Sequence, residues 1–102
     1  MPLLTDAQIA DGLKALPGWT RDGASIRKQF TFASFPAAVD YVQRLVPGAE
    51  AADHHPDLTI NYRRVTVVYS THSDGGLTEK DLAGARTAEA LATSGVHARQ
   101  GE

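Results

Sequence analysis

Apolar and polar positions along the chain recur with two periods, which predict three helices and two pairs of strands. In segments 5–16, 34–46 and 78–94, apolar residues return every three or four positions, as on one face of a helix. In segments 19–32 and 58–72 they alternate every second position, as in strands with one buried face. The order helix, hairpin, helix, hairpin, helix predicts an α+β fold. We expect a two-layer sandwich in which three helices cover one face of a four-stranded antiparallel sheet.

Capping and turn residues predict where these elements begin and end. Thr5 and Gln8 have the spacing of a capping box, and Ser34 is the candidate N-cap of the second helix. Asp22-Gly23 is typical of a two-residue hairpin turn, and a second tight turn is expected near Tyr62.

Pro47 is expected to disturb the second helix. Proline lacks the N–H that bonds one turn back, and its ring crowds that turn, so the helix should kink or end near Val46. A resumed helical turn over 49–53 would then lead into the histidines described below. The stripe expected to face the sheet consists of Phe35, Val39, Val42 and Val46, with Ala38 and Leu45 alongside.

Composition narrows the class of protein. The length of 102 residues corresponds to one domain, expected over residues 1–95, with residues 96–102 as a frayed tail. A net charge of −2 argues against direct binding to nucleic acid or to an anionic membrane. The absence of cysteine excludes a disulfide framework, a thiolate zinc site and a cysteine nucleophile. The start lacks a signal peptide and no apolar run is long enough to cross a membrane, so a cytoplasmic location is expected.

Three of the four histidines lie within nineteen positions of each other, in the segment Asp53-His54-His55-Pro56 and at His72. Pro56 favours an extended His55, so the two adjacent imidazoles should point in different directions. Imidazole titrates near neutral pH and serves as a general acid or base, so the cluster favours proton-transfer chemistry. The alternative is structural: one of the pair is a hydrogen-bonded loop residue, and His72 faces solvent at a strand end.

A zinc site is the other chemical reading of three histidines, because three imidazoles can hold zinc and leave one position open. The spacing does not match the helical H-E-x-x-H pattern, and adjacent histidines rarely chelate one ion. The sequence therefore favours a site without metal.

Acidic residues near the histidines have two possible roles. Asp81 occupies the third helical position if Thr78 is the N-cap, where a carboxylate can bond back to the cap. Glu50 and Asp53 can each orient an imidazole by accepting its N–H, or they can be surface acids of an interrupted helix.

These residues together resemble the pterin-4a-carbinolamine dehydratase family. The resemblance extends from about Thr5 to Ala92, and Pro47-Gly48 departs from it by interrupting the helix expected before the histidines. The matching motifs are Glu50-x-x-Asp53-His54-His55-Pro56, Tyr62, Ser70-Thr71-His72, Gly76-Leu77-Thr78-x-x-Asp81, Leu16-Pro17-Gly18-Trp19 and Phe30-x-Phe32-x-x-Phe35.

The resemblance implies a cofactor-free dehydratase of tetrahydrobiopterin recycling. Such an enzyme removes water from 4a-hydroxytetrahydrobiopterin, or a related 4a-hydroxy pterin, and yields the quinonoid dihydropterin. His54 and His72 would be the acid and base that flank C4a, in either order, and His55 would bind and orient the pterin. The residues expected to contact substrate or support the site are Glu50, Asp53, Ser70, Thr71 and Asp81.

The resemblance also implies a homodimer or homotetramer, with a small-molecule pterin as its substrate. An alternative from the same family is a non-enzymatic role, as a dimerisation cofactor of a transcription factor or as an assembly factor. The retention of all three histidines favours the enzyme.

Overall fold

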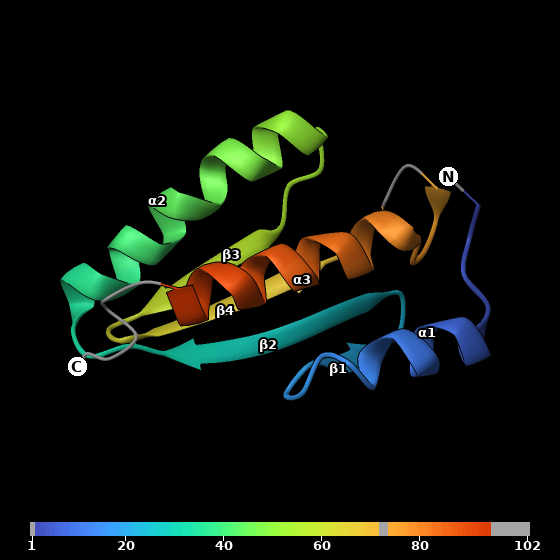
Figure 1. The fold of residues 1–102 in the computed structure, drawn as a ribbon, viewed down its shortest axis with the longest axis horizontal. Coiled ribbons are helices and arrows are strands. Elements are labelled where there is room, and N and C mark those ends of the chain that lie inside the picture. Colours follow the sequence, from blue (N-terminus) through green and yellow to red (C-terminus); the bar gives the residue numbers. More distant parts are fainter. Residues whose placement is uncertain (1, 72–73, 95–102) are drawn as a thin grey trace.

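The computed structural model describes residues 2–71 and 74–94, which form three helices and one antiparallel sheet (Figure 1). His72, Gly95 and the tail 96–102 lie outside the described residues. The sheet has the strand order β1-β2-β4-β3. The elements are α1 (Asp6–Leu13), β1 (Thr20–Asp22), β2 (Ser25–Thr31), α2 (Phe35–Ala52), β3 (Asp57–Asn61), β4 (Arg64–Tyr69) and α3 (Glu79–Ser94).

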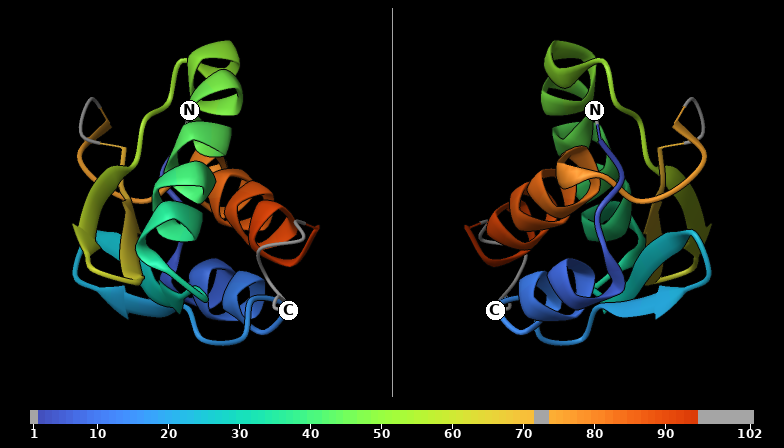
Figure 2. Two further views of the ribbon diagram at one scale, coloured as in Figure 1. Left: turned by 90° about the vertical axis from the view of Figure 1, so that its left-hand side faces the viewer. Right: turned by 90° about the vertical axis from the view of Figure 1, so that its right-hand side faces the viewer.

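The three helices lie on one face of the sheet, which confirms the α+β sandwich (Figure 2). β4 is a central strand: it pairs with β2 on one side and with β3 on the other, so its inward side chains lie in the middle of the core. Val65, Val67 and Tyr69 all point inward and are buried, as the alternation predicts.

The predicted caps of the first two helices are present. Thr5 and Gln8 exchange hydrogen bonds in a complete capping box, and the Ser34 side chain accepts the N–H of Ala37 at the start of α2. The first turn is shifted by one residue, because Asp22 pairs with Ser25 and the loop is Gly23-Ala24. The second turn is at Tyr62-Arg63, as predicted.

The predicted buried stripe of α2 was wrong at both of its ends. Phe35 and Val46 are 50% and 52% exposed, whereas α2 buries Ala38, Tyr41 and Leu45. Tyr41 decides this orientation: its ring packs against Phe32 at a centroid distance of 4.8 Å, and its hydroxyl donates to the Ala88 carbonyl at 2.9 Å. A large ring with a satisfied hydroxyl outweighs the smaller valines.

Of the two effects predicted for Pro47, a kink or an end of the helix near Val46, the end was wrong, because α2 continues through Pro47 to Ala52. Proline removes the hydrogen bond to the carbonyl of Gln43, one turn back. Gln43, Val46 and Pro47 are all exposed, so water can satisfy that carbonyl at the outer side of the helix. Glu50 therefore lies in the last turn of α2, and the histidines follow directly after the end of this helix.

Candidate active site

The end of α2 places the two adjacent histidines. Asp53 caps the helix in the left-handed conformation, with φ of 50°, and its N–H bonds to the carbonyls of Ala49 and Glu50. The N–H of His54 also returns to the Ala49 carbonyl at 3.1 Å. The chain therefore turns sharply out of the helix at Asp53 and enters β3 through Pro56.

His54 is paired with Asp81 across the molecule. Its Nε2 lies 2.7 Å from Oδ1 of Asp81, and the two side chains are 11% and 0% exposed. A carboxylate can only accept, so Nε2 carries the proton that it donates to Asp81. In the neutral imidazole the other nitrogen, Nδ1, is then unprotonated and is the atom able to take up a proton.

The Asp81 carboxylate is held by three donors. Its Oδ2 accepts the Thr78 N–H at 2.9 Å and the Thr71 hydroxyl at 2.8 Å, while Oδ1 accepts His54. Since the Thr71 proton goes to Asp81, the Thr78 hydroxyl donates to Thr71, at 2.9 Å. The predicted cap role of Asp81 is confirmed, and the same carboxylate also orients an imidazole.

His55 has a different environment. Its Nε2 lies 2.6 Å from Oε2 of Glu50, and these side chains are 54% and 69% exposed. The pair borders a hollow of about 170 Å³ with Val46, Pro56 and other residues. The two adjacent histidines thus point in different directions, as predicted, and each is joined to its own carboxylate.

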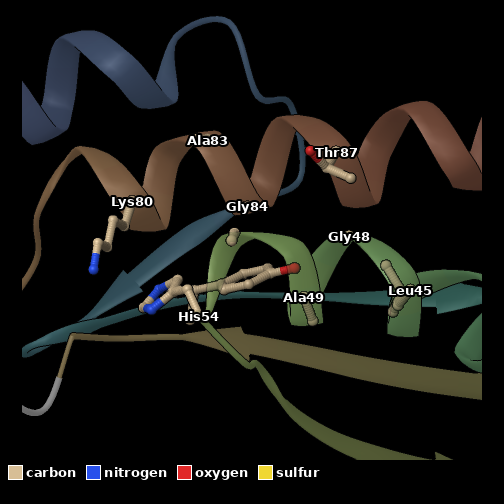
Figure 3. Close-up of a pocket in the computed structure, with 10 residues that line it drawn as sticks. Leu45, Gly48, Ala49, His54, Lys80, Ala83, Gly84 and Thr87 are labelled. Atoms are coloured by element: carbon tan, nitrogen blue, oxygen red, sulfur yellow. The ribbon is translucent and has the colours of Figure 1, made fainter.

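A cavity of about 140 Å³ opens beside His54, between α2 and α3 (Figure 3). Small side chains of the two helices leave this space: Gly48, Ala49, Ala52, Ala83 and Gly84 all line it. Lys80 and Thr87 add polar groups to the wall formed by α3. One buried imidazole therefore borders an otherwise largely apolar hollow.

Tyr69 was not among the predicted site residues, although its ring stacks on His54. The centroids are 5.8 Å apart and the planes differ by 22°. Burial, and next the nearby Asp81 charge, raise the pKa of the Tyr69 hydroxyl to about 12, so it stays protonated at neutral pH. The alternation along the strand did predict that Tyr69 points inward, because residue 69 is on the same face as Val65 and Val67.

Two further predicted site residues, Asp53 and Ser70, have no recorded contact with the His54–Asp81 pair, and the predicted His72 lies outside the described residues. Asp53 is exposed at the end of α2, and Ser70 borders a separate hollow with Thr71 and Gly76. Among residues 2–71 and 74–94, no three histidine, cysteine or acidic side chains gather in a way that could hold a metal. The structure brings together His54, Thr71 and Asp81, and it joins Glu50 to His55 separately.

Comparison with protein families gives a match over residues 2–91 to the family described as pterin 4 alpha carbinolamine dehydratase. The chain belongs to this family. The match spans every described helix and strand up to the last turns of α3.

Bacterial members of the pterin 4 alpha carbinolamine dehydratase family are similar along most of their length. A protein of Mycobacteroides abscessus named "Putative pterin-4-alpha-carbinolamine dehydratase" is 55% identical over 87 residues, which cover 85% of this chain and 93% of that one. A protein of Nocardia farcinica with the same name is 50% identical over 90 residues, which cover 88% and 95% of the two chains.

Two solved structures share the fold of this chain. A crystal structure from Brucella melitensis titled transcriptional coactivator/pterin dehydratase has a TM-score of 0.86 and 35% identity, covering 89% of this chain and 99% of that one. A pterin dehydratase-like protein described as a RuBisCO assembly factor in the alpha-carboxysome has a TM-score of 0.62 at 22% identity, covering 76% and 89%. The second likeness concerns the fold alone. None of the described helices is long and apolar enough to span a membrane.

Proposed function

We propose that this protein is a 4a-hydroxytetrahydrobiopterin dehydratase that works by histidine acid and base catalysis. The observation that carries the proposal is the buried His54–Asp81 pair, 2.7 Å apart, at the edge of a cavity in a member of this family. The reaction would belong to tetrahydrobiopterin recycling, and it requires no cofactor.

The chemistry needs only two proton transfers. The hydroxyl at C4a gains a proton and leaves as water, and the adjacent ring N–H loses a proton as the C=N bond of the quinonoid dihydropterin forms. The number of protons and electrons is then balanced without an oxidant or reductant. One acid and one base that titrate near neutral pH provide both transfers.

His54 would perform one of these transfers through Nδ1. The Asp81 carboxylate fixes the imidazole with Nε2–H directed at Asp81, which leaves Nδ1 as the nitrogen that would accept or donate a proton. His72, which the same family motif contains, would perform the other transfer. The proposal allows either histidine to be the acid, with the other as the base.

The other residues would bind and orient the pterin. We assign His55 with Glu50 to the exposed side of the site, where a pterin edge can replace water on the imidazole. Thr71 would act through Asp81, to which it donates, whereas Asp53 and Ser70 would supply polar contacts at the rim.

A rate assay with chemically generated 4a-hydroxytetrahydropterin tests the proposal. The purified protein, present at far lower concentration than the substrate, should accelerate dehydration. The His72→Ala variant should lose most of that acceleration. Metal chelation should leave the rate unchanged. Loss of activity on chelation, together with bound zinc in elemental analysis, would support the alternative of a zinc site. A protein without any acceleration would point to a non-enzymatic cofactor or assembly role.

We also propose a homodimer or homotetramer. Within the described residues β3 is an edge strand of the sheet, with β4 as its neighbour, and its Ile60 is 38% exposed. Val46 on α2 is exposed as well. Apolar side chains at an open sheet edge favour association with a second copy. Light scattering after size-exclusion chromatography should give twice or four times the 10.9 kDa chain mass, and a monomer at micromolar concentration would refute the proposal.

A further inference from the structure

Tyr69 and Gly84 are in unusually close contact behind the candidate active site. A Cβ added to Gly84 would lie 2.5 Å from Cε1 and 2.8 Å from Cζ of the Tyr69 ring. Real Cβ atoms essentially never come closer than 3.0 Å to such atoms. Tyr69 is only 4% exposed, and its ring lines the same cavity as Gly84 and His54. The aromatic ring therefore occupies the space that any larger residue at position 84 would need.

The same ring touches His54, which connects this contact to the site. Tyr69 stacks on the imidazole with 22° between the planes and 5.8 Å between the centroids. Asp81 holds the same imidazole at its edge, through Nε2. His54 is thus fixed by two independent contacts, one polar and in the plane of its ring, the other aromatic and against its face.

Gly84 and Asp81 lie on one side of α3, because residues three positions apart share a helix face. Figure 3 shows Gly84 on α3 where the helix passes the cavity that His54 borders. The separation between α3 and β4 at Gly84 therefore sets the distance between the Asp81 carboxylate and His54. A methyl group at position 84 would push the helix or the Tyr69 ring, and either movement would disturb the imidazole.

We propose that Tyr69 and Gly84 act together as positioning residues for His54. Tyr69 holds the plane of the imidazole, and the missing side chain at Gly84 lets α3 come close enough for Asp81 to hold its edge. Neither residue transfers a proton. The kinetic consequence rests on the proposed dehydratase function, whereas the structural consequence does not.

Three variants and one matched control separate positioning from simple packing. Tyr69→Phe keeps the ring, Tyr69→Leu removes it, and Gly84→Ala adds the colliding methyl. The control is Phe30→Leu, which removes another buried ring from the same face of the sheet; the aromatic contacts of Phe30 are to Trp19, Phe32 and Tyr41, not to His54.

The first readout is NMR of the His54 ring, which needs no substrate. The imidazole C–H protons and the hydrogen-bonded Nε2–H should keep their positions in Tyr69→Phe and Phe30→Leu, and they should move in Tyr69→Leu and Gly84→Ala. The Gly84→Ala change should have less effect in a Tyr69→Leu background, because the smaller side chain leaves room for the methyl. Unchanged His54 signals in Tyr69→Leu, or equal effects of Gly84→Ala in both backgrounds, would overturn the proposal.

The second readout is the split between kcat and KM. Tyr69→Leu and Gly84→Ala should lower kcat roughly tenfold with KM changed less than about threefold, since a misplaced catalytic group slows the chemical step. Tyr69→Phe should restore the parent kcat. Should His54→Ala retain the parent rate, the assignment of proton transfer to His54 would fail, and a parent protein without any acceleration would refute the dehydratase function. The NMR result would in either case decide whether Tyr69 and Gly84 position the imidazole.

Discussion

Nε2 of His54 lies 2.7 Å from Oδ1 of Asp81, and this contact joins the end of α2 to the first turn of α3. The carboxylate is completely buried, and all three of its recorded partners are donors. A buried acceptor with a full set of donors is held in one orientation, because any rotation would leave a polar group unsatisfied. Asp81 therefore determines which imidazole nitrogen of His54 carries the proton.

Replacing Asp81 by Asn should remove most of the activity and keep the fold. The amide oxygen can still accept from Thr71 and Thr78, which turns the NH2 group toward His54 and requires Nε2 to become an acceptor. The proton then moves to Nδ1, the nitrogen that the reaction needs free. We expect kcat to fall about 100-fold or more, with an unchanged circular dichroism spectrum and exchanged 15N shifts of the two ring nitrogens.

The result that would contradict this prediction is an Asp81→Asn variant that keeps the parent kcat. It would mean that the tautomer of His54 has no part in catalysis. An unfolded variant would be replaced by Asp81→Glu, which keeps the charge and changes only the reach of the carboxylate.

Glu50→Gln is the matched change at the other histidine–carboxylate pair, and it should have a small effect. Both Glu50 and His55 are more than half exposed, so water screens their interaction and competes for it. We expect KM to rise by less than about threefold while kcat stays within a factor of about two. A fall in kcat as large as that of Asp81→Asn would contradict this, because it would show that the exposed pair contributes to the chemistry as much as the His54–Asp81 pair.

Two glycines inside helices should respond oppositely to alanine. At Gly48 an added Cβ meets only Thr87 Cγ2, at an ordinary 3.8 Å, so Gly48→Ala should raise the free energy of unfolding by about 0.5–1 kcal/mol. At Gly84 the added Cβ meets the Tyr69 ring at 2.5 Å, so Gly84→Ala should lower it by about 1–3 kcal/mol. Urea titrations of the two variants check both signs, and stabilisation at both positions would contradict the packing described for Tyr69.

Two buried tyrosines predict a loss of stability in alkali. Burial is the main reason that the pKa of Tyr69 is raised to about 12, and burial likewise raises the pKa of Tyr41. Between pH 10 and 12 the unfolded chain binds fewer protons at Tyr69 than the folded chain does, so the free energy of unfolding falls as pH rises. The contribution of Tyr69 to the free energy of unfolding is fully present below pH 10 and is lost as the pH rises through about 12.

The measurement for this prediction is the free energy of unfolding between pH 8 and 12. The parent should lose stability steeply above pH 10, and the Tyr41→Phe/Tyr69→Phe variant should lose it less steeply. Equal slopes for both proteins would show that the two hydroxyls are not the groups responsible.

The sequence predicted the fold well because its signals are local. The Thr5 capping box, the alternation around Val65 and Val67, and the Tyr62 turn each depend on neighbours a few positions away. Pro47 misled the prediction of α2, because the cost of a lost hydrogen bond depends on solvent exposure, which the sequence does not state.

For the candidate site, the sequence predicted which residues take part better than it predicted which residues contact each other. Asp81 was predicted as a helix cap and as a support for an imidazole, and the structure shows it bonded to Thr78 and His54 together. Tyr69 was missed, because stacking on His54 depends on how β4 and the end of α2 meet in space. Contacts between residues 15 or more positions apart have no signature in a single sequence.

The most direct test of the central claim, that His54 performs proton transfer, is the dehydration rate of the His54→Ala variant. Parent and variant are mixed at equal concentration with freshly generated 4a-hydroxytetrahydropterin, and the quinonoid dihydropterin is followed spectroscopically. We predict rapid dehydration by the parent and a rate at least about 100-fold lower for the folded variant. Equal rates for the two proteins would contradict it.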